Sequence, residues 1–318
     1  KFALSTIGSV ASGGGKITAV ESWTVDGGSG EDDFFVVIMS TGQVILYAGT
    51  NPADADAWKL VGIYDMGKPT GRDTFINQSG DLMGLLGGDY KRITGETLKT
   101  GQTPRNESKM SCAAEEAQVL YGANLGWCAV RNKQYAVFNV PITTSTFQQH
   151  VLNLATNAWT KFDSWNARCF GVYDGDIYFG EGSGKVFKAF SGDNDDGDGI
   201  AWEAQTSWDN LRSPAQKKMV GIRPVMTSQD VLSLGIGLAF DFGVASSPQQ
   251  ITQGTTGALW DDAPWDSSSW STEITAQKQM RGASGSGIVV SAVIRGNTKD
   301  QTVKWFRTDF LWVPGGVM

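Results

Sequence analysis

Short apolar runs of strand length, separated by glycine-rich turns, dominate the hydrophobic pattern of the chain. Residues Asp33–Met39 (DFFVVIM) are almost continuously apolar, as expected of a strand that is buried on both faces. The pair Thr41-Gly42 is a turn signal, and Gln43–Tyr47 (QVILY) follows it as a second strand. This pattern predicts small antiparallel sheets.

The clearest unit of this kind is Asn166–Gly192. Asp174-Gly175-Asp176 separates two runs rich in aromatic and β-branched residues, and Glu181–Gly184 separates the second run from a third. Asp-Gly and Gly-rich turns between such runs are a strong hairpin signal. The segment is typical of one blade of a β-propeller.

The blade pattern recurs along the chain. An Ala-Trp pair followed by an apolar position occurs at Ala57 and again at Ala158, and a Gly-x-Val-apolar unit occurs at Gly42 and at Gly184. Such recurrence favours radially repeated small sheets. One helical pattern interrupts them, at Glu107–Tyr121.

The pattern changes after the acidic run Gly192–Gly199 (GDNDDGDG). Longer alternating segments follow, typical of an antiparallel platform or sandwich. We therefore predict an all-β chain with one short helix: a β-propeller-like region over 1–195, incomplete at its N-terminus, and a platform- or sandwich-like β region over 196–318. The longer strands are expected at Ile200–Trp208, Gln216–Met226, Leu232–Phe240, Ile288–Arg295 and Gln301–Leu311.

Composition agrees with a turn-dense β protein: 318 residues include 40 glycines and 12 tryptophans, and 19% of residues are charged. The formal net charge of −7 argues against a protein that grips nucleic acid, which requires a basic surface. No apolar run approaches the length of a membrane-spanning helix, which is about 18 residues or more. Cys112, Cys128 and Cys169 are widely spaced and odd in number, so we expect reduced, mostly buried thiols. Because the chain starts at Lys1, we expect its biological start to lie upstream.

Four motifs resemble parts of known chemical sites. The acidic loop read from Asn194 resembles a calcium loop through Asp196, Asp198 and Gly199, but its twelfth position, Gln205, is neutral. A solvated acidic turn therefore remains the better interpretation, with cation binding left open.

The other three motifs also lack their required partners. Gly182-Ser-Gly-Lys185 lacks the first glycine of a phosphate loop and is followed by Val186. His150 is the sole histidine and has no nucleophile motif to serve, so we expect a satisfied or exposed strand residue. The carboxylates that would suit a glycosidase lie near aromatic residues, but two of them are turn residues. They are Asp163, Asp174, Asp176 and Glu181. We therefore predict a protein that is not an enzyme, with no cofactor and no metal.

Three tryptophans spaced by five, Trp260, Trp265 and Trp270, fit neither a helix face nor one face of a strand. Indoles in such a looped segment anchor against a sheet or a neighbouring subunit. We take them as candidate interface residues, with packing inside the subunit as the equal alternative.

An ordered set of motifs resembles one family from nearly end to end. The segments Ser22–Gly28, Thr41–Thr50, Val61–Pro69 with Gly71-Arg72, Asn139–Pro141, Asn157–Trp159, Asp195–Gly197, Ser213-Pro214 and the Trp-rich segment carry the resemblance. The chain is similar to the tail tube or nozzle ("stabilisation") proteins of short-tailed bacteriophages. No single motif is decisive, and no catalytic residues come with the family.

The resemblance implies a structural virion protein. Family members form a ring, usually of six copies, below the head-to-tail adaptor and above distal tail components, and the genome leaves through its channel. It implies location in the virion tail, assembled in the bacterial host cytoplasm, with DNA passing without specific binding. A net-acidic wall would repel phosphates, and the strands at Ile200–Trp208 or Gln301–Leu311 would pair across subunits. The alternatives are a carbohydrate-binding or carbohydrate-cleaving propeller for host-surface recognition, and a protein-binding propeller scaffold.

Overall fold

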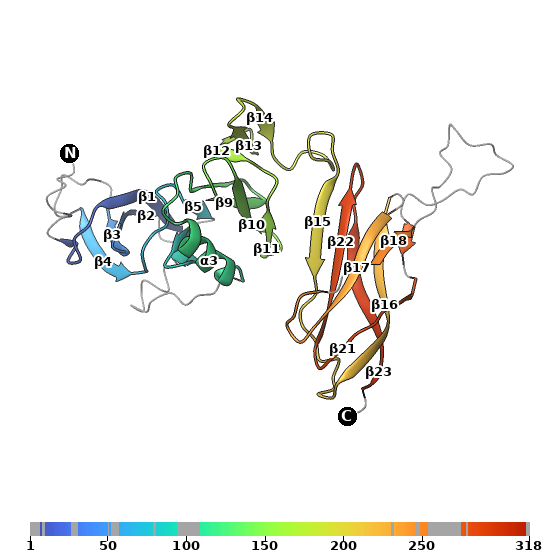
Figure 1. Cartoon of the computed structure of the whole chain (residues 1–318). Helices are drawn as coiled ribbons and strands as arrows, with labels where there is room; N and C mark the ends of the chain where they lie inside the picture. The colour runs from blue at the N-terminus through green and yellow to red at the C-terminus, as the bar shows by residue number, and fades with distance from the viewer. Residues whose placement is uncertain are drawn as a thin grey trace. The chain divides into compact units, whose positions relative to one another are not determined.

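The structure is a computed structural model of the whole chain (Figure 1). It describes residues 7, 10–26, 31–49, 51, 57–78, 81–93, 109–229, 232–245, 249–253, 275–277 and 279–315. These residues form antiparallel sheets with the helix α3 (Ser111–Tyr121), which confirms the all-β class. Two compact units divide between Phe190 and Ser191. The predicted boundary at residue 195 lies inside the first loop of the second unit.

Among its described residues, the first unit contains four small sheets in chain order, here called blades. In each blade, strands that are consecutive in sequence pair as an antiparallel meander, as in a propeller. The first blade is β1 (Ile17–Asp26), β2 (Glu31–Met39), β3 (Gln43–Ala48) and β4 (Lys59–Asp65), and the second is β5 (Phe75–Gln78), β6 (Asp81–Leu86) and β7 (Asp89–Ile93). The third is β8 (Cys128–Arg131), β9 (Tyr135–Pro141), β10 (Phe147–Asn153) and β11 (Ala158–Phe162), and the fourth is β12 (Ala167–Tyr173), β13 (Asp176–Glu181) and β14 (Val186–Lys188).

The first blade is apolar on both faces. Val36 and Ile38 of β2 join a core cluster with Leu82 and other residues of the second blade. The alternate residue Val37 belongs to a different cluster, which includes Ile7. The prediction that Asp33–Met39 is buried on both faces is thus confirmed for the buried residues of this run, and one of those faces forms the joint to the second blade.

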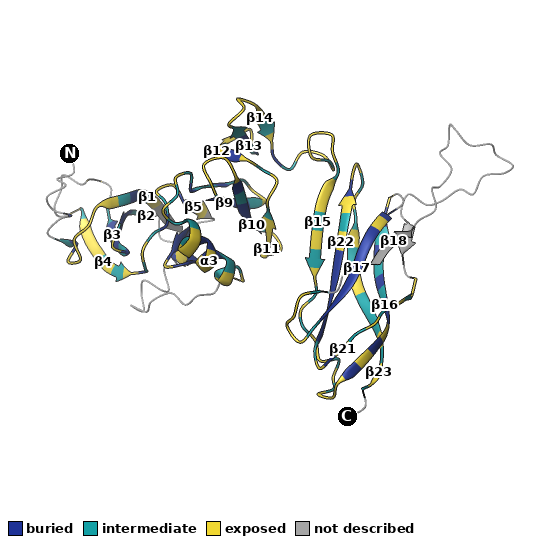
Figure 2. Ribbon diagram, viewed as in Figure 1, coloured by how far each residue is buried: buried dark blue, intermediate teal, exposed yellow. Residues whose placement is uncertain are grey.

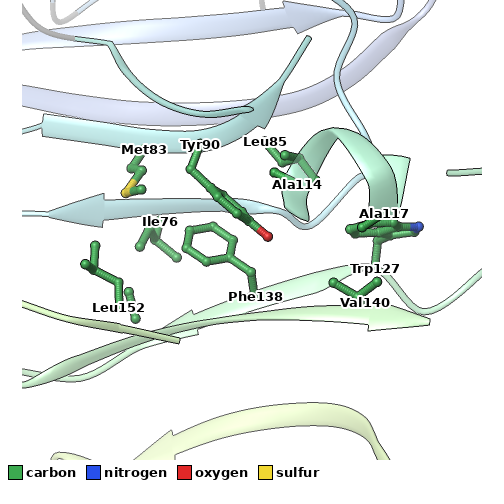
Figure 3. Packing of buried hydrophobic residues seen from close by; sticks show 11 residues of the cluster. Ile76, Met83, Leu85, Tyr90, Ala114, Ala117, Trp127, Phe138, Val140 and Leu152 are labelled. Carbon is green, nitrogen blue, oxygen red and sulfur yellow. The ribbon is translucent and has the colours of Figure 1, made fainter. Parts of the chain in front are cut away.

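Aromatic rings join the second blade to the third (Figure 3). Tyr90 of β7 lies 4.4 Å, centroid to centroid, from Phe138 of β9 and 4.7 Å from Trp159 of β11. Two alanines of helix α3, Ala114 and Ala117, complete the cluster. Full burial of one large apolar side chain contributes about 1.5–3 kcal/mol, so this joint is a substantial part of the fold's stability.

Buried polar side chains also cross the joints. Between the first and second blades, Lys91 Nζ donates to the carbonyl of Met66 at 3.0 Å. Between the second and third, the Tyr90 hydroxyl and His150 Nδ1 share a hydrogen bond of 2.7 Å. Each bond satisfies groups that would otherwise be costly to bury.

The joint between the third and fourth blades uses two amides on neighbouring strands. Asn139 Nδ2 donates to the carbonyl of Ala167 at 3.0 Å, and Gln149 Nε2 donates to the carbonyl of Trp165 at 2.8 Å. Gln149 Nε2 also donates to Asn139 Oδ1 at 2.9 Å. The two buried amides therefore orient each other while holding the fourth blade.

The fourth blade is the hairpin unit expected at Asn166–Gly192. Asp174 and Gly175 have φ of 50° and 82°, the left-handed values of a type I′ turn, and Tyr173 pairs with Asp176 across it. An aspartate tolerates the left-handed region and a glycine adopts it freely. The Asp-Gly pair therefore fixes the register of β12 on β13.

Two local predictions need correction. Helix α3 begins at Ser111 and not at Glu107, since residues 109 and 110, the first described residues of this segment, are not helical. The sequence also predicts a loop over Ile142–Phe147 before a strand that starts at His150, but Phe147 itself starts β10 and its ring is buried. His150 therefore lies in the middle of β10, and not at its start.

The second unit is a sandwich of two antiparallel sheets. One has the order β15 (Ile200–Gln205), β22 (Val290–Thr298), β17 (Leu232–Phe240) and β18 (Gln249–Gln253). In the other, β16 (Lys217–Ser228) pairs along one side with β19 (Thr275–Gln277), β20 (Arg281–Gly282) and β21 (Ser286–Gly287), and along its other side with β23 (Lys304–Pro314). Both sheets contribute to one core, for example Ile222 and Met226 from β16 with Leu234 from β17 and Ile294 from β22.

A buried lysine closes one end of this sandwich. Lys217 is 1% exposed, and its Nζ donates to the carbonyls of Ser213, Ala215 and Ile288 at 2.6, 2.9 and 2.8 Å. The same ammonium lies 5.6 Å from the ring centroid of Trp312. One cation thus satisfies three carbonyls from the loop before β16 and the segment before β22.

Replacing Lys217 by Met is expected to lower the free energy of unfolding by about 2–4 kcal/mol, because the carbonyls lose their donor while the apolar volume is kept. Chemical denaturation of the full chain measures the change. Lys218→Met is the matched control, since Lys218 is exposed on the same strand, and it should shift stability by no more than about 0.5 kcal/mol. Equal effects of the two changes would contradict this role for Lys217.

His150 should make the fold sensitive to acid. Burial, with a smaller effect of Lys161, lowers the pKa of His150 from 6.5 to about 4. Because the folded-state pKa is depressed, the histidine's contribution is complete above pH 6.5 and is lost as the pH falls toward 4, by up to about 3 kcal/mol.

The aspartates and glutamates of the chain also titrate in this pH range. Comparing the wild type with His150→Asn separates the contribution of the histidine from theirs. The variant keeps a side-chain group near the Tyr90 hydroxyl and does not titrate. The difference in unfolding free energy between the two proteins should change between pH 7 and pH 4; parallel stability curves over this range would refute the assignment.

Candidate assembly interface

Two of the edge strands of the second unit, β15 and β23, are the candidate interface. Within the described part of the chain, β15 pairs with β22 alone and β23 pairs with β16 alone. The backbone groups along the other side of each strand therefore lack a ladder partner. An uncovered edge of this kind is a template for pairing with another chain, and natural sheets normally protect it.

The β23 edge is long and largely apolar. It spans 11 residues, with Pro314 at its last position. Its inward residues, such as Phe310 and Trp312, pack in the sandwich core, while Phe306 is 64% exposed and Leu311 49% exposed. The ladder of β23 on β16 is bulged at Phe306, where Trp305 and Arg307 lie opposite consecutive residues of β16. From Arg307 to Val313 neither a proline nor a bulge interrupts β23, so this part of the edge is suited to pairing.

A row of charges lies on the outward face of β23. Arg223 of β16 contacts Asp309 Oδ2 through Nη2 at 2.7 Å, and Arg307 Nε lies 3.2 Å from Asp309 Oδ1. Arg307 has a 66% exposed side chain, so its guanidinium retains free donors at the surface. The sequence predicts a strand at Gln301–Leu311 but does not single out these charged side chains. The alternation of Arg307 and Asp309 is the sequence pattern that indicates them.

The β15 edge has the opposite sign of charge. Trp202 points into the core, whereas Glu203 is outward, with a 51% exposed side chain that pairs with Arg295 of the neighbouring β22. Most of β15 is exposed (Figure 2). The acidic loop of the sequence directly precedes this strand, so negative charge is concentrated at its start.

The acidic loop is a turn whose polar groups bond one another. Asn194 Nδ2 donates to Asp300 Oδ1 at 2.6 Å, and Asn194 Oδ1 accepts from the backbone N–H of Gly197 at 3.0 Å. Asp195 and Asp198 exchange two backbone hydrogen bonds of 2.9 Å. The first-position side chain of the calcium-loop alignment is thus oriented by bonds to Asp300 and Gly197, and the twelfth position, Gln205, is neutral and ends strand β15.

The remaining sequence candidates do not converge on one site. Asp176 pairs with Lys188 at 2.6 Å, and Glu181 Oε2 accepts from the Ser183 hydroxyl at 2.7 Å. The backbone of Gly184 donates to the carbonyl of Glu181 in the second hairpin turn, so the Gly-Ser-Gly-Lys run has a turn role. Asp163 and Asp174 are exposed. His150 belongs to the buried joint described above.

The cysteine prediction is partly wrong. The three thiols are free, but Cys112 and Cys169 are exposed and Cys128 is partly buried. Cys112 lies in the first turn of α3. Cys169 lies opposite Gly180 in the β12–β13 ladder. Burial, reinforced by Asp73, raises the pKa of the Cys128 thiol to about 12, so it is not a nucleophile at neutral pH.

Trp260, Trp265 and Trp270 lie outside the described residues, and their role as interface anchors stays a prediction. Across the described ranges, no cluster of three or more His, Cys, Asp or Glu side chains has the arrangement to hold a metal ion. No helix found within these ranges is long and apolar enough to cross a membrane.

Comparisons with known proteins give little further information. No protein-family model matches the chain, and no curated protein matches it. Among solved structures, the chain is similar to a glycoside hydrolase family 43 arabinoxylan arabinofuranohydrolase from Bacillus subtilis, in complex with cellotetraose. The match has 8% identity and a TM-score of 0.29, and it covers 92% of this chain and 78% of that one. A similarity of this size carries no argument about fold or function.

Calcium is expected to leave the melting temperature unchanged, because Asn194 is engaged within its own loop. A bound ion present at about ten times its Kd would add about 1.4 kcal/mol of stability, which thermal melting detects. Melting in calcium should match melting in EDTA. A calcium-specific rise that disappears in Asp196→Asn, a change that tolerates the φ of 50° at this position, would show that the loop is a cation site.

Proposed function

We propose that this protein is a tail nozzle subunit of a short-tailed bacteriophage, which assembles into a ring around the path of the exiting genome. The observation that carries the proposal is the second unit, whose edge strands β15 and β23 have no further strand partner among the described residues and suit a protein completed by its neighbours. The ordered motifs that resemble the nozzle family, from Ser22–Gly28 to Ser213-Pro214, supply the particular role.

The charge of the chain is compatible with a conduit. Each phosphate neutralised by a lysine or arginine adds affinity through counterion release, so a wall that binds DNA would retard its passage. A protein with a net charge of −7 repels the phosphates instead. On this proposal the partners are other copies of the chain, the head-to-tail adaptor and distal tail components.

The proposal needs no chemical step. The polar groups of the blades that sequence patterns suggested as chemical sites have structural partners: Lys188 for Asp176, Ser183 for Glu181 and Tyr90 for His150. The alternative function is that of a propeller that binds or cleaves carbohydrate, and the experiment below distinguishes it from the nozzle role.

Electron microscopy of the purified full chain in negative stain is expected to show closed rings with a central channel, six-fold in the family to which the chain is similar. DNA should bind weakly at physiological salt, because the net charge of the protein opposes it. Fluorescence anisotropy of a labelled duplex measures that affinity.

A monomer or trimer that binds or cleaves polysaccharide would overturn the nozzle role in favour of host-surface recognition. Tight DNA binding that falls steeply with salt would contradict the low-friction channel even if rings form, since the slope counts the phosphates that the protein contacts.

A further inference from the structure

We propose that β15 of one copy pairs with β23 of the next, so that a sheet runs from each second unit into its neighbour. This inference deepens the proposed function and rests on it only for the closure of the ring. It names the two surfaces in contact and the side chains that select them.

The backbone groups along the free sides of β15 and β23 favour pairing with another strand. Each edge presents N–H and C=O groups that lack a ladder partner within the described residues, and a strand is the shape that satisfies a whole row of them. Two suitable edges lie on the same unit, six and 11 residues long. A six-residue ladder extends about 20 Å, enough to fix the orientation of one copy on another.

Charge selects unlike edges. The β15 strand carries one formal charge, at Glu203, and follows the aspartates of the acidic loop. The β23 strand carries Lys304, Arg307 and Asp309, a net positive set. Opposite charges across a ladder are favourable, and like charges directly opposite are destabilising. Pairing of β15 with β23 joins negative to positive, whereas either edge paired with its own copy joins like to like.

Antiparallel pairing through Glu203 and Arg307 follows from these charges. Both side chains are on the outward faces of their sheets and half or more exposed, at 51% and 66%. Every ladder between named strands of this chain is antiparallel among the described residues. In this register Ala201 lies opposite Asp309, on the side of Arg307 away from the bulge at Phe306, so the regular part of the new ladder brings no like charges together.

Unlike-edge pairing has a geometric consequence. The two contacting surfaces are different, so the contact is heterologous and leaves one free β15 and one free β23 at the ends of any open chain. Successive copies therefore add in one direction until rotation brings the ends together. This is the assembly that a ring requires, and each contact covers the free edges of one β15 and one β23.

Disulfide trapping tests the contact. In a chain with Cys112 and Cys169 changed to Ser and Cys128 to Ala, Glu203→Cys and Arg307→Cys are introduced together, and mild oxidation is followed by non-reducing electrophoresis. We expect a ladder of covalent multimers that ends at the size of the ring. The matched control combines Arg307→Cys with Val119→Cys, a 76% exposed position on α3 of the first unit. The control should stay monomeric.

The outcomes separate the two proposals. Rings on the grid without a ladder, either for this pair or for Ala201→Cys with Asp309→Cys, would overturn the edge contact and leave the nozzle role intact. A ladder from a protein that forms open filaments rather than rings would overturn the nozzle role and support the edge contact. A covalent product that stops at a dimer from Arg307→Cys alone would show that like edges pair, which contradicts the inference.

Discussion

The fold of the first unit depends on one constraint: central strands such as β2, β6 and β9 are buried on both faces, so the blades that contain them must be covered twice. In β2, Val36 and Val37 are consecutive and both have no exposed surface, yet they belong to different core clusters. A sheet of this kind cannot face water on one side, as ordinary antiparallel sheets do. Stacking blade on blade is the arrangement that meets the requirement with short chain connections.

Stacking alone would leave the blades free to slide, because apolar contact is not directional. The polar groups at the joints remove that freedom. The Tyr90–His150 bond, the Lys91–Met66 bond and the amides Asn139 and Gln149 each have one geometry in which buried groups are satisfied. A displaced blade would leave these groups unpaired at a cost of about 1–3 kcal/mol for each. The apolar faces thus supply most of the stability, and the polar bonds supply the register.

The sequence predicted what local patterns determine. The run Asp33–Met39, the turn at Asp174-Gly175 and the strand Leu232–Phe240 follow from periodicity and turn chemistry, and the structure has them at these places. Contacts between distant strands left no such local signal. Lys217 and His150 are buried because each meets groups far along the chain, at Ile288 and Tyr90. Exposure of Cys112 and Cys169 was missed for the same reason, since their neighbours are set by packing.

The second unit resolves the same problem differently, and the difference bears on assembly. Its two sheets bury one face each against the other, so its faces are closed without further blades. Among the described residues, the sandwich leaves backbone groups unpaired at its sheet edges, and β15 and β23 are two of these edges. Backbone pairing is nearly independent of side-chain identity, so an open edge by itself accepts any strand. Selectivity must then come from the few side chains beside it. The acid at Glu203 and the base at Arg307 are placed to provide that selectivity, since reversal of either sign would make a like edge as acceptable as an unlike one.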